Sequence, residues 1–69
     1  MKRISVNSSN IAEVGYDVGT QTLEVLFHNG NIYQYFDVPE KVYDGLVAAS
    51  SVGAFFNSQI KGVYRFAKT

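Results

Sequence analysis

One stretch decides the fold: Thr22-Leu-Glu-Val-Leu-Phe-His-Asn-Gly-Asn-Ile-Tyr-Gln-Tyr-Phe-Asp-Val-Pro39. It predicts two strands joined by Asn29-Gly30, a dipeptide that tolerates the positive φ angles of a two-residue type I′ turn. Such a turn sets the register, with His28 opposite Asn31. One face then carries Leu23, Val25, Phe27, Ile32, Gln34 and Phe36, and the other carries Glu24, Leu26, His28, Asn31, Tyr33 and Tyr35. We expect the first face to be the core and the second to be the functional surface.

The flanking segments extend this hairpin in both directions. Residues 11–18 alternate as a preceding strand, in which Gly15 indicates a bulge or a close approach by a neighbouring side chain. Residues 2–6 form a candidate edge segment. After Pro39 the apolar spacing becomes helical, which predicts helices over about 39–49 and 52–59, the second capped by Ser51. Residues 63–66 alternate weakly and are a candidate last strand.

These elements predict an α+β fold over one domain, residues 1–69. Its sheet is a three-stranded antiparallel meander, to which a terminal segment can add a further strand. Two helices pack on one face of the sheet. Phe55 and Phe56 are adjacent and point about 100° apart on their helix, so we expect one to pack on the sheet and the other on the first helix.

Length and composition narrow the class of protein. A chain of 69 residues buries only a small core, so a homo-oligomer remains open. The chain has no cysteine, which excludes disulfides and thiolate metal sites. No apolar run approaches the roughly 20 residues of a membrane span, and the basic N-terminus lacks the apolar segment of a signal peptide. We expect a cytoplasmic protein that does not enter a membrane.

The charges balance to zero, but they are segregated along the chain. All six acidic residues fall within residues 13–44, and five of the six basic residues lie outside that range. Two interpretations follow. The terminal charges are an ordinary solvated surface, or the two ends meet and form a basic patch for an anion or a nucleic acid.

No catalytic or metal-binding constellation is recognisable. His28 is the only histidine and borders a turn, without a second ligand at a spacing that would hold a metal. Ser8 and Ser9 are nucleophile candidates by elimination only, and their ordinary role is in the turn over residues 7–10. We therefore predict that the protein is not an enzyme and needs no cofactor.

An aromatic and basic surface is the remaining candidate site. Tyr33 and Tyr35 lie two residues apart on a strand, about 7 Å apart on the same face, where each ring can stack on a base. The predicted nucleic-acid-binding residues are Tyr33, Tyr35, Arg3, Lys61, Tyr64, Arg65 and Lys68. In the other interpretation the second helix or the C-terminal segment covers the tyrosines, which then form a packing motif.

An ordered set of residues and motifs runs through most of the chain: Ser8-Ser9, Gly15-Tyr16-Asp17, Leu23-x-Val25-x-Phe27, Gly30, Tyr33-x-Tyr35, Val38-Pro39, Val42-Tyr43, Leu46, Ala49-x-Ser51-x-Gly53, Phe55-Phe56-Asn57, Ile60 and Tyr64. With this set, and with Tyr33-x-Tyr35 as the hallmark, the sequence resembles the KTSC domain over about residues 6–64. That family is named for its occurrence at the C-terminus of some lysyl-tRNA synthetases and is also found as small free-standing bacterial and phage proteins. At position 52, where we associate the family with lysine, this chain has Val52.

Three functions fit these observations. The synthetase context of the family implies RNA binding, so the leading hypothesis is a non-enzymatic accessory module that binds RNA or another single-stranded nucleic acid. The alternative is a protein-interaction or self-association domain that uses the tyrosine face or a sheet edge. A third is a regulator that binds a small nucleotide, which requires a pocket between sheet and helices.

Overall fold

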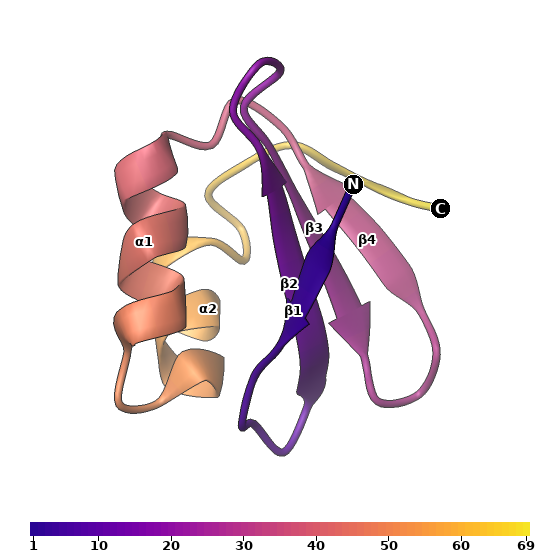
Figure 1. Ribbon diagram of the computed structural model, residues 1–69, viewed down its shortest axis with the longest axis vertical. Helices are drawn as coiled ribbons and strands as arrows, with labels where there is room; N and C mark the ends of the chain where they lie inside the picture. The colour runs from indigo at the N-terminus through magenta and orange to yellow at the C-terminus, as the bar shows by residue number, and fades with distance from the viewer.

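Five antiparallel strands form one sheet. Two helices cover one of its faces (Figure 1). The computed structural model describes residues 1–69. Strand order in the sheet follows chain order, and no helix is long and apolar enough to cross a membrane. The elements are β1 (Arg3–Ser5), β2 (Ile11–Asp17), β3 (Thr22–Phe27), β4 (Ile32–Tyr35), α1 (Glu40–Ala48), α2 (Val52–Gln59) and β5 (Phe66–Lys68).

The predicted α+β class and the two helices on one face are confirmed, but the sheet is larger than predicted. Both ends of the chain add a strand, since β1 pairs with β2 and β5 pairs with β4. The last strand begins at Phe66, beyond most of the predicted segment 63–66. The reason is local: the N–H groups of Val63 and Tyr64 both donate to the Ile60 carbonyl, so these residues continue the turn after α2.

The register of the central hairpin differs by one residue from the prediction. Leu23 lies opposite Tyr35, and Val25 lies opposite Tyr33. The loop has three residues, because the Phe27 N–H donates to the Asn31 carbonyl while the Gly30 N–H donates to the Phe27 carbonyl. Within this loop only Gly30 takes a positive φ, 92°. This is the pattern of three-residue hairpin loops, in which a turn is followed by one residue in the left-handed conformation. The predicted type I′ turn is therefore wrong.

This shift reverses the faces of β4, because side chains alternate along a strand. Tyr33 and Tyr35 share the helix-facing side with Leu23 and Val25, whereas Gln34 lies on the opposite, uncovered side beside Glu24. Tyr35 is 5% exposed and belongs to the core. The predicted faces hold for residues 23–27 and are exchanged for residues 32–36, so Ile32 and Phe36 are not core residues.

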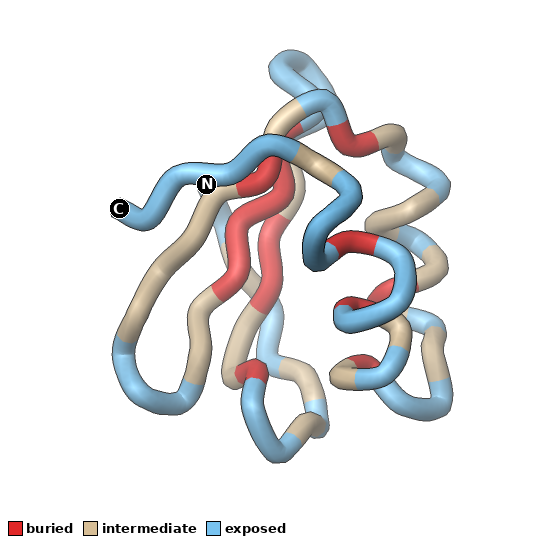
Figure 2. The backbone as a smooth tube through the Cα atoms, turned by 180° about the vertical axis from the view of Figure 1, so that it is seen from behind, coloured by how far each residue is buried: buried red, intermediate tan, exposed pale blue.

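The core fills the space between the sheet and the helices, and the buried segments run along the central strands and the inner sides of both helices (Figure 2). The predicted division between Phe55 and Phe56 is confirmed. The Phe56 ring packs edge-on against Phe27 and Tyr35 of the sheet. The Phe55 ring lies over Gly45 of α1, where an added Cβ would come within 2.8 Å of it, so glycine permits close helix packing.

Both helices begin near the residues that the sequence singled out. Pro39 is extended, with ψ at 146°, and directly precedes α1 rather than occupying its first turn. Ser51 caps α2 as predicted, because its Oγ accepts a hydrogen bond from the Ala54 N–H at 3.3 Å. The Ser51 cap fixes where α2 starts, and hence which of its side chains face the sheet.

The exchanged faces of β4 predict unequal effects for two neighbouring substitutions. Tyr35→Ala removes a buried ring and is expected to lower the free energy of unfolding by about 3–5 kcal/mol. Phe36→Ala removes a ring on the uncovered side, where it contacts the Arg65 guanidinium, and is expected to cost about 1 kcal/mol. Urea unfolding of both variants measures the difference. A Phe36→Ala variant less stable than Tyr35→Ala would contradict the observed register.

Candidate ligand-binding cleft

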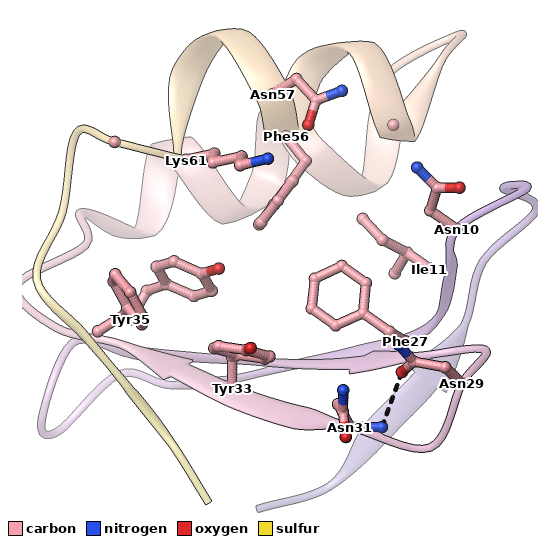
Figure 3. A pocket seen from close by; sticks show the side chains of 13 residues that line it. Asn10, Ile11, Phe27, Asn29, Asn31, Tyr33, Tyr35, Phe56, Asn57 and Lys61 are labelled. Carbon is pink, nitrogen blue, oxygen red and sulfur yellow. Dashed lines mark hydrogen bonds between the residues drawn. The ribbon is translucent and has the colours of Figure 1, made fainter.

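A cleft opens between the helix-facing side of the sheet and α2 (Figure 3). Its volume is about 380 Å³. Strands β3 and β4 supply its floor, α2 supplies its roof, and the segments before β2 and after α2 close its sides. It is lined by 13 residues: Asn10, Ile11, Phe27, Asn29, Asn31, Tyr33, Tyr35, Gly53, Phe56, Asn57, Lys61, Gly62 and Phe66.

Five rings form the apolar part of the cleft, and we call them the aromatic cluster: Phe27, Tyr33, Tyr35, Phe56 and Phe66. Tyr35 is its centre, with ring centroids 6.5 Å from Tyr33, 5.5 Å from Phe56 and 5.7 Å from Phe66. Tyr33 also packs edge-on against Phe27 at 5.6 Å. The cluster therefore joins β3, β4, α2 and β5 into one aromatic surface.

The polar part of the cleft is formed by asparagines and one lysine. Lys61 is the only charged residue among those that line the cleft, and it makes no ion pair. Lys68 lies directly opposite Tyr33 across the β4–β5 pair, so its side chain shares the helix-facing side of the sheet. The cleft thus has two free ammonium groups nearby and no carboxylate in its lining, which favours an anionic ligand.

The two predicted tyrosines, Tyr33 and Tyr35, differ in how deeply they are buried. Tyr33 is partly buried and lines the cleft. Tyr35 is 5% exposed and its ring packs against Tyr33, Phe56 and Phe66, so little of that ring is open to a stacked base. Phe66, which was not among the predicted site residues, is 59% exposed and contacts both tyrosines. The sequence feature that could have identified Phe66 as a site residue is its position in the alternating, basic C-terminal segment.

The remaining predicted residues lie away from the cleft. Tyr64 is partly buried and packs against the core. The guanidinium of Arg65 pairs with Asp37 at 2.9 Å and lies over the Phe36 ring, at 5.2 Å from its centroid. Val52, at the position where lysine was associated with the family, is buried in the core. These residues therefore contribute no free charge to the cleft.

Arg3 belongs to a polar network on the uncovered side of the sheet. Its Nε donates to Glu13 at 2.9 Å and its Nη1 donates to Glu24 at 2.6 Å. Gly15 makes room for this strand, since an added Cβ would lie 2.6 Å from the Lys2 carbonyl oxygen and 3.0 Å from Arg3 Cγ. The contact with Arg3 confirms the predicted close approach of a side chain, whereas the irregularity of β2 lies between Ile11 and Glu13. The two ends of the chain form opposite edges of the sheet, about four inter-strand steps of 4.8 Å apart, so they do not make one basic patch.

Glu24 is the centre of the network. Gln34 donates to one carboxylate oxygen at 2.9 Å, and Arg3 donates to the other. These hydrogen bonds, that from Gln34 foremost, hold the pKa of Glu24 below its ordinary value although burial of the carboxyl opposes the shift. The charged groups of this network on the uncovered side therefore pair with one another, whereas the lysines near the cleft have no ion-pair partner.

His28 lies outside the cleft lining at the tip of the hairpin. It is exposed, and its Nε2 is 2.8 Å from the Ser8 carbonyl oxygen. Its backbone N–H donates to the Asn10 carbonyl. These contacts give His28 a structural role, in which it ties the hairpin to the loop before β2. No group of three or more metal-ligating side chains occurs in the structure.

The fold and the cleft define a small α+β domain in which α2 and an antiparallel meander enclose an aromatic-lined hollow. The family model of the KTSC domain matches residues 7–64, and the chain belongs to this family. A crystal structure of a KTSC domain protein from Yersinia pestis has the same fold, with a TM-score of 0.93 and 39% sequence identity over 99% of this chain and 96% of that one.

Two further relatives indicate where such domains occur. An uncharacterized protein of Stutzerimonas stutzeri is 43% identical over 61 residues, covering 88% of this chain and 86% of its own. A lysine–tRNA ligase of Nostoc punctiforme is 43% identical over 58 residues, covering 84% of this chain but 10% of the ligase. The same kind of domain therefore occurs in a small protein and as a minor part of a large one.

The network around Glu24 predicts a specific loss of stability in acid. Because the pKa of Glu24 is lower in the native state than the unfolded value of about 4.3, its contribution is complete above that pH and is lost as the pH falls through the native pKa. Glu24→Gln is expected to unfold more easily at neutral pH and to lose less further stability below about pH 4.3.

Urea unfolding at a series of pH values measures this effect. Asp44→Asn is the matched control, because Asp44 is exposed on α1 and makes no ion pair. It is expected to keep the acid profile of the unsubstituted protein. An unchanged acid profile in Glu24→Gln would show that the network does not stabilise the native state.

Proposed function

We propose that this domain is a small non-enzymatic accessory module that binds single-stranded RNA at the cleft. The observation that carries the proposal is the conjunction of accessible aromatic rings with two unpaired lysines. Tyr33 and Phe66 present the accessible rings, and Lys61 and Lys68 present the ammonium groups. Proteins that bind single-stranded nucleic acids without sequence preference combine these two kinds of group.

Each group has a defined part in such a complex. Bases stack on aromatic rings, and a stacked base contributes about 1–3 kcal/mol. Phe66 lies on the edge strand β5 with 59% of its surface exposed, which makes it the better platform. Lys61 and Lys68 lie beside the rings and are placed to neutralise phosphates. The strand would therefore run along β5 and over the mouth of the cleft.

The distribution of charge favours the cleft over the rest of the surface. Both arginines are held by carboxylates, Arg3 by Glu13 and Glu24, and Arg65 by Asp37. A polyanion that approached the uncovered side would have to compete with these acids. Near the cleft the lysines have no such partner. A net charge of zero limits long-range attraction, so we expect weak binding with modest dependence on salt.

The relatives give the proposal a biochemical context. One of them is a lysine–tRNA ligase, a protein that acts on an RNA, and this chain matches about a tenth of its length. A small domain attached to such an enzyme is well placed to add contacts to RNA.

Self-association is the rival function, and the sheet edges argue against it. The edge strands β1 and β5 have three residues each. Short edge strands are one way in which sheets avoid pairing with another chain. A protein partner would therefore have to use the cleft itself. A dimer in sedimentation velocity that Tyr33→Ser converts to a monomer would support this rival.

RNA binding is expected to depend on the two cleft lysines. In fluorescence anisotropy with labelled oligouridine and oligoadenosine at low salt, the unsubstituted protein should bind with an affinity that falls as salt rises. Each phosphate contact contributes about 0.7 to the slope of log affinity against log salt for single strands. The double variant Lys61→Ala/Lys68→Ala should therefore lose about 1.4 from that slope.

Lys41→Ala provides the matched control, since Lys41 is exposed on α1 and does not line the cleft. It is expected to bind as the unsubstituted protein does. The proposal fails if no oligonucleotide binds at low salt, or if Lys41→Ala weakens binding as much as the cleft variant.

A further inference from the structure

The Tyr35 hydroxyl is a polar group in a buried place without a partner in the chain. Tyr35 is 5% exposed, yet its hydroxyl takes part in none of the side-chain hydrogen bonds. Every fully shielded side-chain polar atom has a partner, so this hydroxyl must retain some contact with open space. In Figure 3 it points beneath Phe56 into the cleft. Tyr16 shows the contrast, because its hydroxyl donates to the Val38 carbonyl.

Such a group favours a ligand that offers a hydrogen bond. Buried polar groups are almost always paired, and leaving one unpaired in the presence of an apolar occupant is costly. A purely apolar ligand would leave the Tyr35 hydroxyl unsatisfied, whereas a heterocycle with polar atoms on its edge would pair with it. The hydroxyl can donate and accept, so it suits either kind of edge atom.

The walls of the cleft suit a flat ring. Phe27 stands nearly perpendicular to both Tyr33 and Phe56, at interplanar angles of 89° and 77°, and Phe56 stands at 79° to Tyr35. A planar occupant can therefore meet ring faces and ring edges together, the geometries that aromatic groups prefer. The volume of about 380 Å³ lies near the lower end of the range for small-ligand sites, about 300–1,000 Å³. It holds one nucleotide-sized ligand and not a stack of several.

The rim carries groups that complement the rest of a nucleotide. Asn57 lines the cleft from α2, and Asn10 lines it from the loop before β2 (Figure 3). Neither amide makes a hydrogen bond within the chain, and each offers donors and an acceptor. Lys61 extends into the cleft from the end of α2, within reach of a phosphate attached to the same ligand.

We infer that the cleft receives one nucleobase, whose edge is recognised by the Tyr35 hydroxyl and the Asn57 amide, while Lys61 binds its phosphate. This inference deepens the proposed function and rests on it where the base belongs to an RNA strand. A free nucleotide offers the same chemistry. The cleft would then provide base preference, and the Phe66 and Lys68 surface would hold the neighbouring nucleotides of a strand.

Removal of one oxygen atom tests the inference. Tyr35→Phe keeps the ring that the core needs and deletes only the hydroxyl. Tyr43→Phe is the matched control, because Tyr43 lies on α1 and stacks on Tyr16, outside the cleft lining. Both variants and the unsubstituted protein are titrated with the four nucleoside 5′-monophosphates and with the four homopolymeric oligoribonucleotides, and binding is followed by isothermal titration calorimetry. Thermal unfolding confirms that each variant is folded.

The unsubstituted protein is expected to prefer one base in the oligonucleotides. Tyr35→Phe should weaken binding of that base about fivefold to tenfold and leave the other bases unchanged, whereas Tyr43→Phe changes nothing. If only a free monophosphate binds, and Tyr35→Phe weakens that binding to the same extent, the base pocket is supported and its ligand is a free nucleotide. The proposal of RNA binding is then rejected. Oligonucleotide binding that Tyr35→Phe leaves unchanged overturns the base pocket and keeps the RNA proposal. No binding of either kind of probe overturns both.

Discussion

The three-residue loop at the tip of the central hairpin is the constraint on which the rest of the structure depends. Gly30 takes a left-handed conformation there, and the Phe27 N–H pairs with the Asn31 carbonyl. This closure fixes the register of β4, and a shift of one residue would turn every β4 side chain to the other side. With the observed register, Tyr33 and Tyr35 face the helices. The cleft exists because these two rings leave a hollow beneath α2.

The two sides of the sheet consequently differ in how their charges are satisfied. On the uncovered side, Arg3, Glu24 and Gln34 form a closed network that leaves little for a ligand. On the helix-facing side, Lys61 and Lys68 remain unpaired next to aromatic rings. A chain with no net charge thus presents two unpaired ammonium groups beside the aromatic cluster. The proposals for RNA binding and for a base pocket both follow from this separation.

Local features of the fold were predictable from the sequence, and long-range features were not. Ser51 marked the start of α2, and the adjacent phenylalanines correctly indicated contacts to both the sheet and α1. The predicted register was wrong because Asn29-Gly30 is compatible with two loop lengths. Both faces of residues 32–36 are also apolar enough to be a core, so the hydrophobic pattern did not distinguish the two registers. The C-terminal segment over the tyrosines and a pocket between sheet and helices were open alternatives. The sequence could not decide them, because the cleft requires β5 to bring Phe66 beside Tyr35 from thirty-one residues along the chain.

The central claim is that the inward tyrosines create the surface that binds nucleic acid. Mapping amide chemical-shift changes by NMR, during titration with a short single-stranded oligoribonucleotide, tests it most directly. The account predicts that the changes gather at Tyr33, Asn57, Lys61 and the neighbouring residues of β5. Changes centred on Arg3 and the uncovered side of the sheet, or no changes at low salt, would contradict it.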